Sequence, residues 1–181
     1  MKNSILNTDQ LIKRCKQNDY QAQMFVYNSY KNMMYGVAYR ILNNRENAED
    51  LIQDAFIVGF QKIHQIQDEA NLGGWLKRIV TNKSLDKLRM DKRIQMVDQE
   101  LAIENTTEEE AQIDPRIPVE VVKKAINELK EKYRIVLTLY LIEDYNHREI
   151  GEMLQIKEST VRNQYKRGKQ QLLELIKTSR L

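Results

Sequence analysis

Residues 147–167 read HREIGEMLQIKESTVRNQYKR, and this stretch decides the fold of the C-terminal part of the chain. It predicts two short helices, 147–154 and 158 onward, that flank a turn. Gly151 stands where a side chain would prevent a steep crossing of the two helices. The small apolar core that they would share consists of Ile150, Leu154, Ile156 and Val161. This pattern is typical of a helix-turn-helix, which places its second helix in the major groove of DNA.

The second helix of this motif carries side chains suited to DNA. We expect Ser159 and Thr160 to cap it, because their oxygens accept hydrogen bonds from first-turn amides. The outward positions that follow are Arg162, Asn163, Lys166, Arg167 and Lys169. Arg and Asn form paired hydrogen bonds with guanine and adenine edges, and Lys suits phosphate. An ordinary two-helix turn with a solvated basic face remains the alternative for this segment.

One position in the turn fits the motif poorly. Gln155 occupies the site where glycine is usual. A left-handed conformation costs a residue with a side chain roughly 1 kcal/mol, so the sequence predicts a slightly strained or differently shaped turn.

Composition limits the class of protein. The 181 residues are 41% hydrophobic and 30% charged, as in a globular protein, and no run approaches the roughly 20 apolar residues that span a bilayer. The first residues, MKNS, lack the apolar core of a signal peptide, so we expect a cytoplasmic protein without membrane insertion. The lone Cys15 cannot form an internal disulfide. Six glycines, two prolines and long 3.6-residue apolar periods predict an all-α fold.

Charge divides the chain into three parts. Residues 98–114 carry seven acidic residues and no basic one, whereas the parts before and after each have a net charge of +5. Such an acidic stretch buries too little apolar area to order itself. We therefore predict two small helical domains, 1–94 and 119–181, joined by an acidic flexible linker, 95–118.

The clearest amphipathic helix of the first domain is predicted over 45–65, after Asn44 as a cap. Its outer face is acidic, and Asp50 and Asp54 lie one turn apart, where like charges repel. Such a face suits a basic partner, although a solvated face is the alternative. The preceding helix, predicted over 19–42, is expected to bury a stripe that includes Phe25 and Met33.

A third helix is predicted over 75–93, after a loop over 65–74. Its surface carries seven basic residues against two acidic ones, which suits a phosphate backbone. The chain shows no phosphate-binding glycine loop, Ser/His/Asp arrangement or metal-ligand cluster, and its two histidines are far apart. We therefore predict no catalysis, no cofactor and no metal.

Taken together, these parts resemble a bacterial RNA polymerase sigma factor of the extracytoplasmic-function (ECF) group of the sigma-70 family. The resemblance spans nearly the whole chain. In the first half it rests on AYRIL at 38–42, NAEDLIQDAF at 47–56, and WLKRI at 75–79 with Asn82, Asp86 and Arg89. In the second half it rests on Leu129, YRIVL at 133–137, EDY at 143–145 and the helix-turn-helix. Gly168 departs from the family pattern, at a helix-propensity cost of about 1 kcal/mol.

The resemblance implies a two-domain factor that directs promoter recognition and melting. The first domain would dock on the coiled coil of the largest subunit of core RNA polymerase through Glu49, Asp50, Gln53 and Asp54. It would bind the minus-10 element, with one base taken out of the stack, through Asp68, Asn71, Lys77, Arg78, Asn82, Lys83 and Arg89. The second domain would bind the minus-35 element of promoter DNA through Lys157, Ser159, Thr160, Arg162, Asn163, Lys166 and Arg167. An anti-sigma factor is a plausible regulator.

Two other functions remain open at this point. A stand-alone helix-turn-helix transcriptional regulator would explain the C-terminal motif but would give no role to the basic helix and the acidic linker. A helical adaptor that binds only proteins would use the acidic face, and its binding to nucleic acid would not depend on salt as phosphate contacts do.

Overall fold

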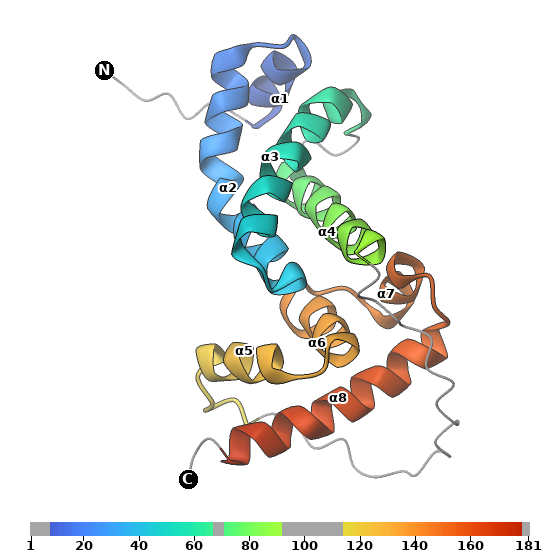
Figure 1. Ribbon diagram of the computed structural model, residues 1–181. Helices are drawn as coiled ribbons and strands as arrows, with labels where there is room; N and C mark the ends of the chain where they lie inside the picture. Colours follow the sequence, from blue (N-terminus) through green and yellow to red (C-terminus); the bar gives the residue numbers. More distant parts are fainter. Residues whose placement is uncertain (1–7, 67–70, 92–113, 179–181) are drawn as a thin grey trace. The chain divides into compact units, whose positions relative to one another are not determined.

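The computed structural model describes residues 8–66, 71–91 and 114–178, and within these ranges the chain forms helices and no strands (Figure 1). The all-α prediction is therefore confirmed. The chain divides into two compact units, one up to Lys87 and one from Leu88 on. Most of the predicted linker lies outside the described residues. In the described part of the chain, no helix is long and apolar enough to cross a membrane.

The first unit is built from helices that are joined by short capped turns. Asp19 caps the second helix by accepting a hydrogen bond from the Ala22 amide at 3.1 Å, and Arg14 of the first helix donates to the same carboxylate at 2.8 Å. Asn44 caps the third helix in the same manner, through the Asn47 amide at 2.9 Å. The elements are α1 (Thr8–Lys16), α2 (Tyr20–Leu42), α3 (Arg45–Lys62), the 3₁₀ turn η1 (Ile63–Gln65) and α4 (Leu72–Met90).

The core of the first unit lies mainly between α2 and α3. Tyr27 of α2 meets Phe56 of α3 edge to face, with ring centroids 4.9 Å apart. The buried side chains here include Val26, Met34, Val37, Ile41, Ala48, Leu51 and Ala55. The prediction that Phe25 and Met33 belong to this core is wrong, because they are 54% and 49% exposed.

The only cysteine of the chain, Cys15, is buried in the first unit. Burial raises the pKa of its thiol to about 11, and the nearby Asp19 carboxylate adds to this effect. The thiol is therefore protonated at neutral pH and packs as a small apolar side chain.

The helix α4 begins three residues earlier than the predicted start at Trp75. The Asn71 side chain accepts a hydrogen bond from the Gly74 amide at 3.1 Å, and this contact opens the first turn. The side chains of Leu72, Leu76 and Val80 are buried and form the inner side of the helix.

The second unit contains α5 (Val119–Glu128), α6 (Glu131–Leu137), the π-helical turn η3 (Thr138–Ile142), α7 (His147–Leu154) and α8 (Glu158–Thr178). The long helix α8 runs past α5, α6 and α7 and supplies much of the core (Figure 1). At Gly168, α8 comes so close to α6 that a Cβ would lie 3.0 Å from the Tyr133 Cβ and 3.2 Å from the Leu137 Cδ1. Glycine is a poor helix former, but its lack of a side chain here allows the two helices to approach closely.

Candidate protein and nucleic-acid interfaces

The helix-turn-helix is formed by α7, a three-residue turn and α8. Asn146 opens α7 with a capping box, in which its side chain accepts from the Glu149 amide at 3.0 Å and Glu149 accepts from the Asn146 amide at 2.9 Å. Gly151 is required by packing, because a Cβ there would lie 2.9 Å from the carbonyl oxygen of Ile156. Gln155 adopts the left-handed conformation, φ 58° and ψ 39°, so of the two predicted possibilities the strained turn is the one that forms.

An aromatic cluster links the two helices of the motif. The ring of His147, the first residue of α7, stacks on Tyr140 of η3 at 4.4 Å between centroids, and both rings contact Tyr165 of α8 at 5.1 and 4.6 Å. The cluster joins the start of α7 to the middle of α8. It therefore fixes the crossing of the two helices with packing that the small apolar core alone would not supply.

The predicted DNA-binding residues of α8 are mostly on its outer surface. The exposed ones are Lys157, Ser159, Arg162, Asn163 and Lys166, whereas Thr160 and Arg167 are half-buried. The prediction that Ser159 and Thr160 cap the helix is wrong. The helix begins at Glu158, and the carbonyl of Lys157 accepts the first hydrogen bonds, from the Thr160 and Val161 amides.

One of these residues already has a partner. The guanidinium of Arg162 donates to the Glu158 carboxylate one turn earlier, through Nη2 at 2.5 Å and Nε at 3.1 Å. This hydrogen bond is the main reason why the pKa of Glu158 lies below its usual range, and the charges of His147 and Arg148 lower it further. Arg148 has its own carboxylate, Glu152, at 3.2 Å.

The acidic side chains predicted for polymerase binding lie on α3, and they do not share one environment. Asp50, Gln53 and Asp54 are exposed, and within the described residues no ion pair joins either aspartate to a basic side chain. Glu49 accepts from Arg45 Nε at 2.9 Å, and this contact raises the pKa of Arg45. Glu49 therefore stands at the edge of the acidic face.

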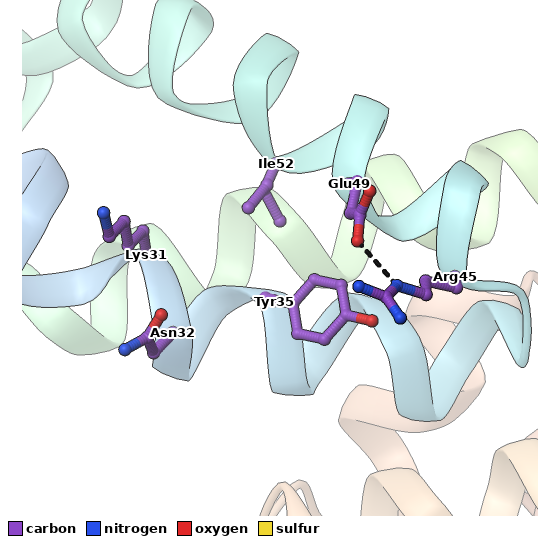
Figure 2. A pocket seen from close by; sticks show the side chains of 6 residues that line it. All are labelled: Lys31, Asn32, Tyr35, Arg45, Glu49 and Ile52. Carbon is purple, nitrogen blue, oxygen red and sulfur yellow. Dashed lines mark hydrogen bonds and ion pairs between the residues drawn. The ribbon is translucent and has the colours of Figure 1, made fainter.

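Glu49 and Arg45 line a shallow groove of about 220 Å³ between α2 and α3 (Figure 2). Tyr35 points toward the Arg45–Glu49 pair, and Lys31 and Asn32 extend the same wall along α2 (Figure 2). At one end of the groove, Arg45 and Glu49 form an ion pair with each other. The carboxylates of Asp50 and Asp54 on the outer side of α3, in contrast, are exposed.

Sequence reasoning missed Ile57, which is 57% exposed. On an α-helix it lies next to Gln53, Asp54 and Asp50, at spacings of four, three and seven residues. Ile57 is thus an apolar side chain at the C-terminal end of the acidic face. The signal was available, since an isoleucine that falls outside the buried stripe of an amphipathic helix must be exposed.

The predicted minus-10 residues on α4 are only partly brought together. Arg78 and Asn82, four residues apart, are exposed, while Lys77, Lys83 and Arg89 are half-buried. Asn71 already uses its side-chain oxygen to cap α4. Asp68 lies outside the described residues. Among the described residues, no group of three or more His, Cys, Asp or Glu side chains is gathered in the manner of a metal site.

Comparison with known proteins gives matches over both units. Residues 26–94 match the family described as Sigma-70 region 2, and residues 120–172 match Sigma-70, region 4. The chain is 33% identical over 172 residues to the ECF RNA polymerase sigma factor SigW of Bacillus subtilis, covering 89% of this chain and 92% of that protein. It is 34% identical over 148 residues to the ECF RNA polymerase sigma factor SigE of Mycolicibacterium smegmatis, covering 79% of this chain and 57% of that one.

The fold also has a counterpart among solved structures. The sigma factor RpoE of Bartonella quintana, solved in complex with the anti-sigma factor NepR, superimposes with a TM-score of 0.55 at 22% identity. The match covers 85% of this chain and 96% of that one.

Proposed function

This chain belongs to the extracytoplasmic-function group of the sigma-70 family, and from that premise we propose which of its surfaces meet RNA polymerase and which meet DNA. It is a sigma factor, a protein that directs promoter recognition in transcription initiation. Sigma factors are generally DNA-binding factors without enzymatic activity, and we extend this to the present chain. We assign the domains as 1–94 and 119–181, with 95–118 as the linker.

The first surface is the acidic face of α3, and the coiled coil of the largest polymerase subunit is its partner. The observation that carries this assignment is the exposure of Asp50, Gln53 and Asp54, with neither aspartate in an ion pair among the described residues. Unpaired surface carboxylates attract a basic partner and speed its approach. Ile57 would provide an apolar contact beside these side chains, since a few buried anchors contribute most of the binding free energy of an interface. Glu49 would contribute from the edge.

The second surface is the basic side of α4, which would bind the separated strand at the minus-10 element. The exposed Arg78 and Asn82 would make the first contacts, one with phosphate and one through amide hydrogen bonds. Lys77, Lys83 and Arg89 would add charge from half-buried positions, and Asp68 and Asn71 would lie beside the flipped base.

The third surface is the start of α8, which would read the minus-35 element in the major groove. Its exposed residues include Arg162 and Asn163, whose side chains recognise guanine and adenine edges. Lys157 and Lys166 would contact phosphate, and Ser159, Thr160 and Arg167 would complete the surface.

Regulation by an anti-sigma factor is part of this proposal. The sigma factor of Bartonella quintana with the matching fold was solved in complex with such a protein. A free factor of this kind needs restraint, since it would otherwise compete for polymerase without an inducing signal. We place its action in the cytoplasm, where polymerase and promoters are found.

The test is a pull-down of bacterial core RNA polymerase with the full chain and with its Asp50→Lys/Asp54→Lys variant. We expect at least about a tenfold loss of affinity, because reversed charges would repel a basic partner. Glu120→Lys/Glu128→Lys is the matched control, since it makes the same change of charge at two exposed positions of α5. Circular dichroism checks the folding of both variants. Equal binding by the wild type and the α3 variant would refute the assignment of this face.

A further inference from the structure

The contact between Glu158 and Arg162 couples an acidic side chain to a side chain that we assign to base recognition. Both donor atoms of Arg162 reach the same oxygen, Oε1 of Glu158, at 2.5 and 3.1 Å. The side chains are 66% exposed for Arg162 and 41% exposed for Glu158, so DNA can approach the pair. The guanidinium is thereby held along the first turn of α8.

The carboxylate also lies near two basic side chains of α7. His147 and Arg148 of α7 act on Glu158 electrostatically, and both favour its ionised form. Glu158 lines a hollow of about 380 Å³ over the turn, together with Arg148, Glu152 and Lys157. It therefore adds negative charge to a surface whose other role is to attract phosphate.

We propose that Glu158 is a positioning residue that sets the base selectivity of Arg162. This inference rests on the proposed reading of duplex DNA by α8. The carboxylate engages Nε and Nη2 of Arg162 and holds the guanidinium in one orientation, while the remaining N–H donors stay available for DNA. A guanine edge offers two acceptors, O6 and N7, that these donors can reach together, whereas phosphate or another base edge requires a different orientation of the guanidinium.

Selectivity follows from this exchange because specificity is a difference between two affinities. Arg162 can keep its ion pair with Glu158 on a guanine edge, whereas binding to phosphate or to an unmatched base requires the pair to break, and these complexes therefore lose affinity. Without the carboxylate, Arg162 would bind phosphate and unmatched bases more readily. An exposed ion pair of this kind is worth enough to change relative affinities by about two- to fivefold.

The experiment is a selection from a duplex library with a randomised block, using the tagged full chain in the presence of bacterial core RNA polymerase. The bound DNA is sequenced, and binding to unselected library DNA is measured separately. Arg162→Ala identifies the base position that depends on Arg162. Glu158→Gln removes the charge at constant shape, and Glu158→Asp keeps the charge but shortens its reach.

Glu152→Gln is the matched control, because Glu152 pairs with Arg148 in the same i, i+4 arrangement. We expect Glu158→Gln to reduce base enrichment at the Arg162-dependent position about two- to fivefold and to raise binding to unselected DNA. Glu158→Asp should lose the enrichment while binding to unselected DNA stays low. Glu152→Gln should leave the enrichment unchanged, and thermal unfolding checks the stability of each variant.

The results separate this inference from the function on which it rests. If Arg162→Ala removes the preference and Glu158→Gln does not change it, the positioning role is wrong while the reading of DNA by Arg162 stands. An equal effect of Glu152→Gln would mean that only bulk charge matters, and this too would overturn the inference. If Arg162→Ala leaves every base preference intact, the assignment of Arg162 fails and the role of Glu158 fails with it.

Discussion

The outer faces of α3 and α8 both carry exposed charges, but they differ in whether these charges form ion pairs. On α3, neither Asp50 nor Asp54 is in an ion pair among the described residues, and Ile57 lies at the C-terminal end of the face. On α8, Arg162 is bound to Glu158. A face with one protein partner can keep its charge available, whereas a face that must distinguish among many DNA sequences gains from restraint.

The largest effect is expected from a substitution that disturbs the turn of the helix-turn-helix. Gly151→Ala would place a Cβ 2.9 Å from the Ile156 carbonyl oxygen, where the backbone of the turn must move. We expect a loss of about 1–3 kcal/mol in the free energy of unfolding, measured by thermal and chemical denaturation, together with weaker DNA binding.

Gly36→Ala is the control for this prediction. A Cβ at Gly36 would meet only the flexible end of Arg40, at 3.0 Å. Stability should change by less than about 1 kcal/mol, because the gain in helix propensity offsets the displaced side chain. A change in Gly151→Ala as small as that expected for Gly36→Ala would show that the turn tolerates a Cβ at Gly151.

The helix-turn-helix and the acidic face of α3 could be predicted from sequence because their signals are local. Caps such as Asn44 and Asn146 mark helix starts, and residues with 3.6-residue spacing mark buried sides. The short helix α1 has few apolar residues and was not predicted. The start of α4 was missed because Gly73 and Gly74 read as a loop, yet the Asn71 side chain turns them into the first turn of a helix.

Burial was harder to predict than helix position. Phe25 and Met33 are apolar residues on a helix, but the sequence alone does not say how wide a side of α2 the neighbouring helices cover. The partners of Glu49 and Arg162 are likewise choices among several possible contacts. Their i, i+4 spacing allows an ion pair, but only the structure shows that it forms.

On the α3 side, Ile57→Ala sharpens the comparison by separating apolar contact from charge. We expect about a five- to tenfold loss of affinity for core polymerase, as for an apolar side chain that becomes buried in an interface. Stability should hardly change, because Ile57 is 57% exposed. Surface plasmon resonance with immobilised polymerase measures the affinity. Phe25→Ala, at a similarly exposed position of α2, should bind as the wild type does, and a matching loss there would point to a general effect of exposed apolar area.

A smaller effect is expected at the turn between α7 and α8. Gln155→Gly should raise the free energy of unfolding by about 0.5–1 kcal/mol, because glycine adopts the left-handed conformation without strain. Asn43→Gly is the comparison, since Asn43 has φ 50° and asparagine tolerates this region better. Denaturant titration of both variants tests this order, and a larger gain at Asn43 would contradict it.

The smallest effect concerns the edge of the acidic face. Arg45→Gln removes the partner of Glu49 and leaves the face more negative. We expect polymerase affinity to rise by at most about twofold at low salt, and the gain to vanish as salt increases. Binding curves at several ionic strengths measure this. A clear loss of affinity would mean that Arg45 itself contacts the partner.

Gly168 restricts the movement of α8 along its own axis. Helices that meet only through long side chains can slide by a fraction of a turn, since those side chains adjust. At Gly168 the backbone of α8 rests close to Tyr133 and Leu137, so sliding in either direction would bring a bulkier residue into the same space. Arg162 lies six residues before this fixed point, about 9 Å along the helix axis. The glycine thus fixes the position of α8 along its own axis, and with it the positions of Arg162 and its neighbours relative to α6.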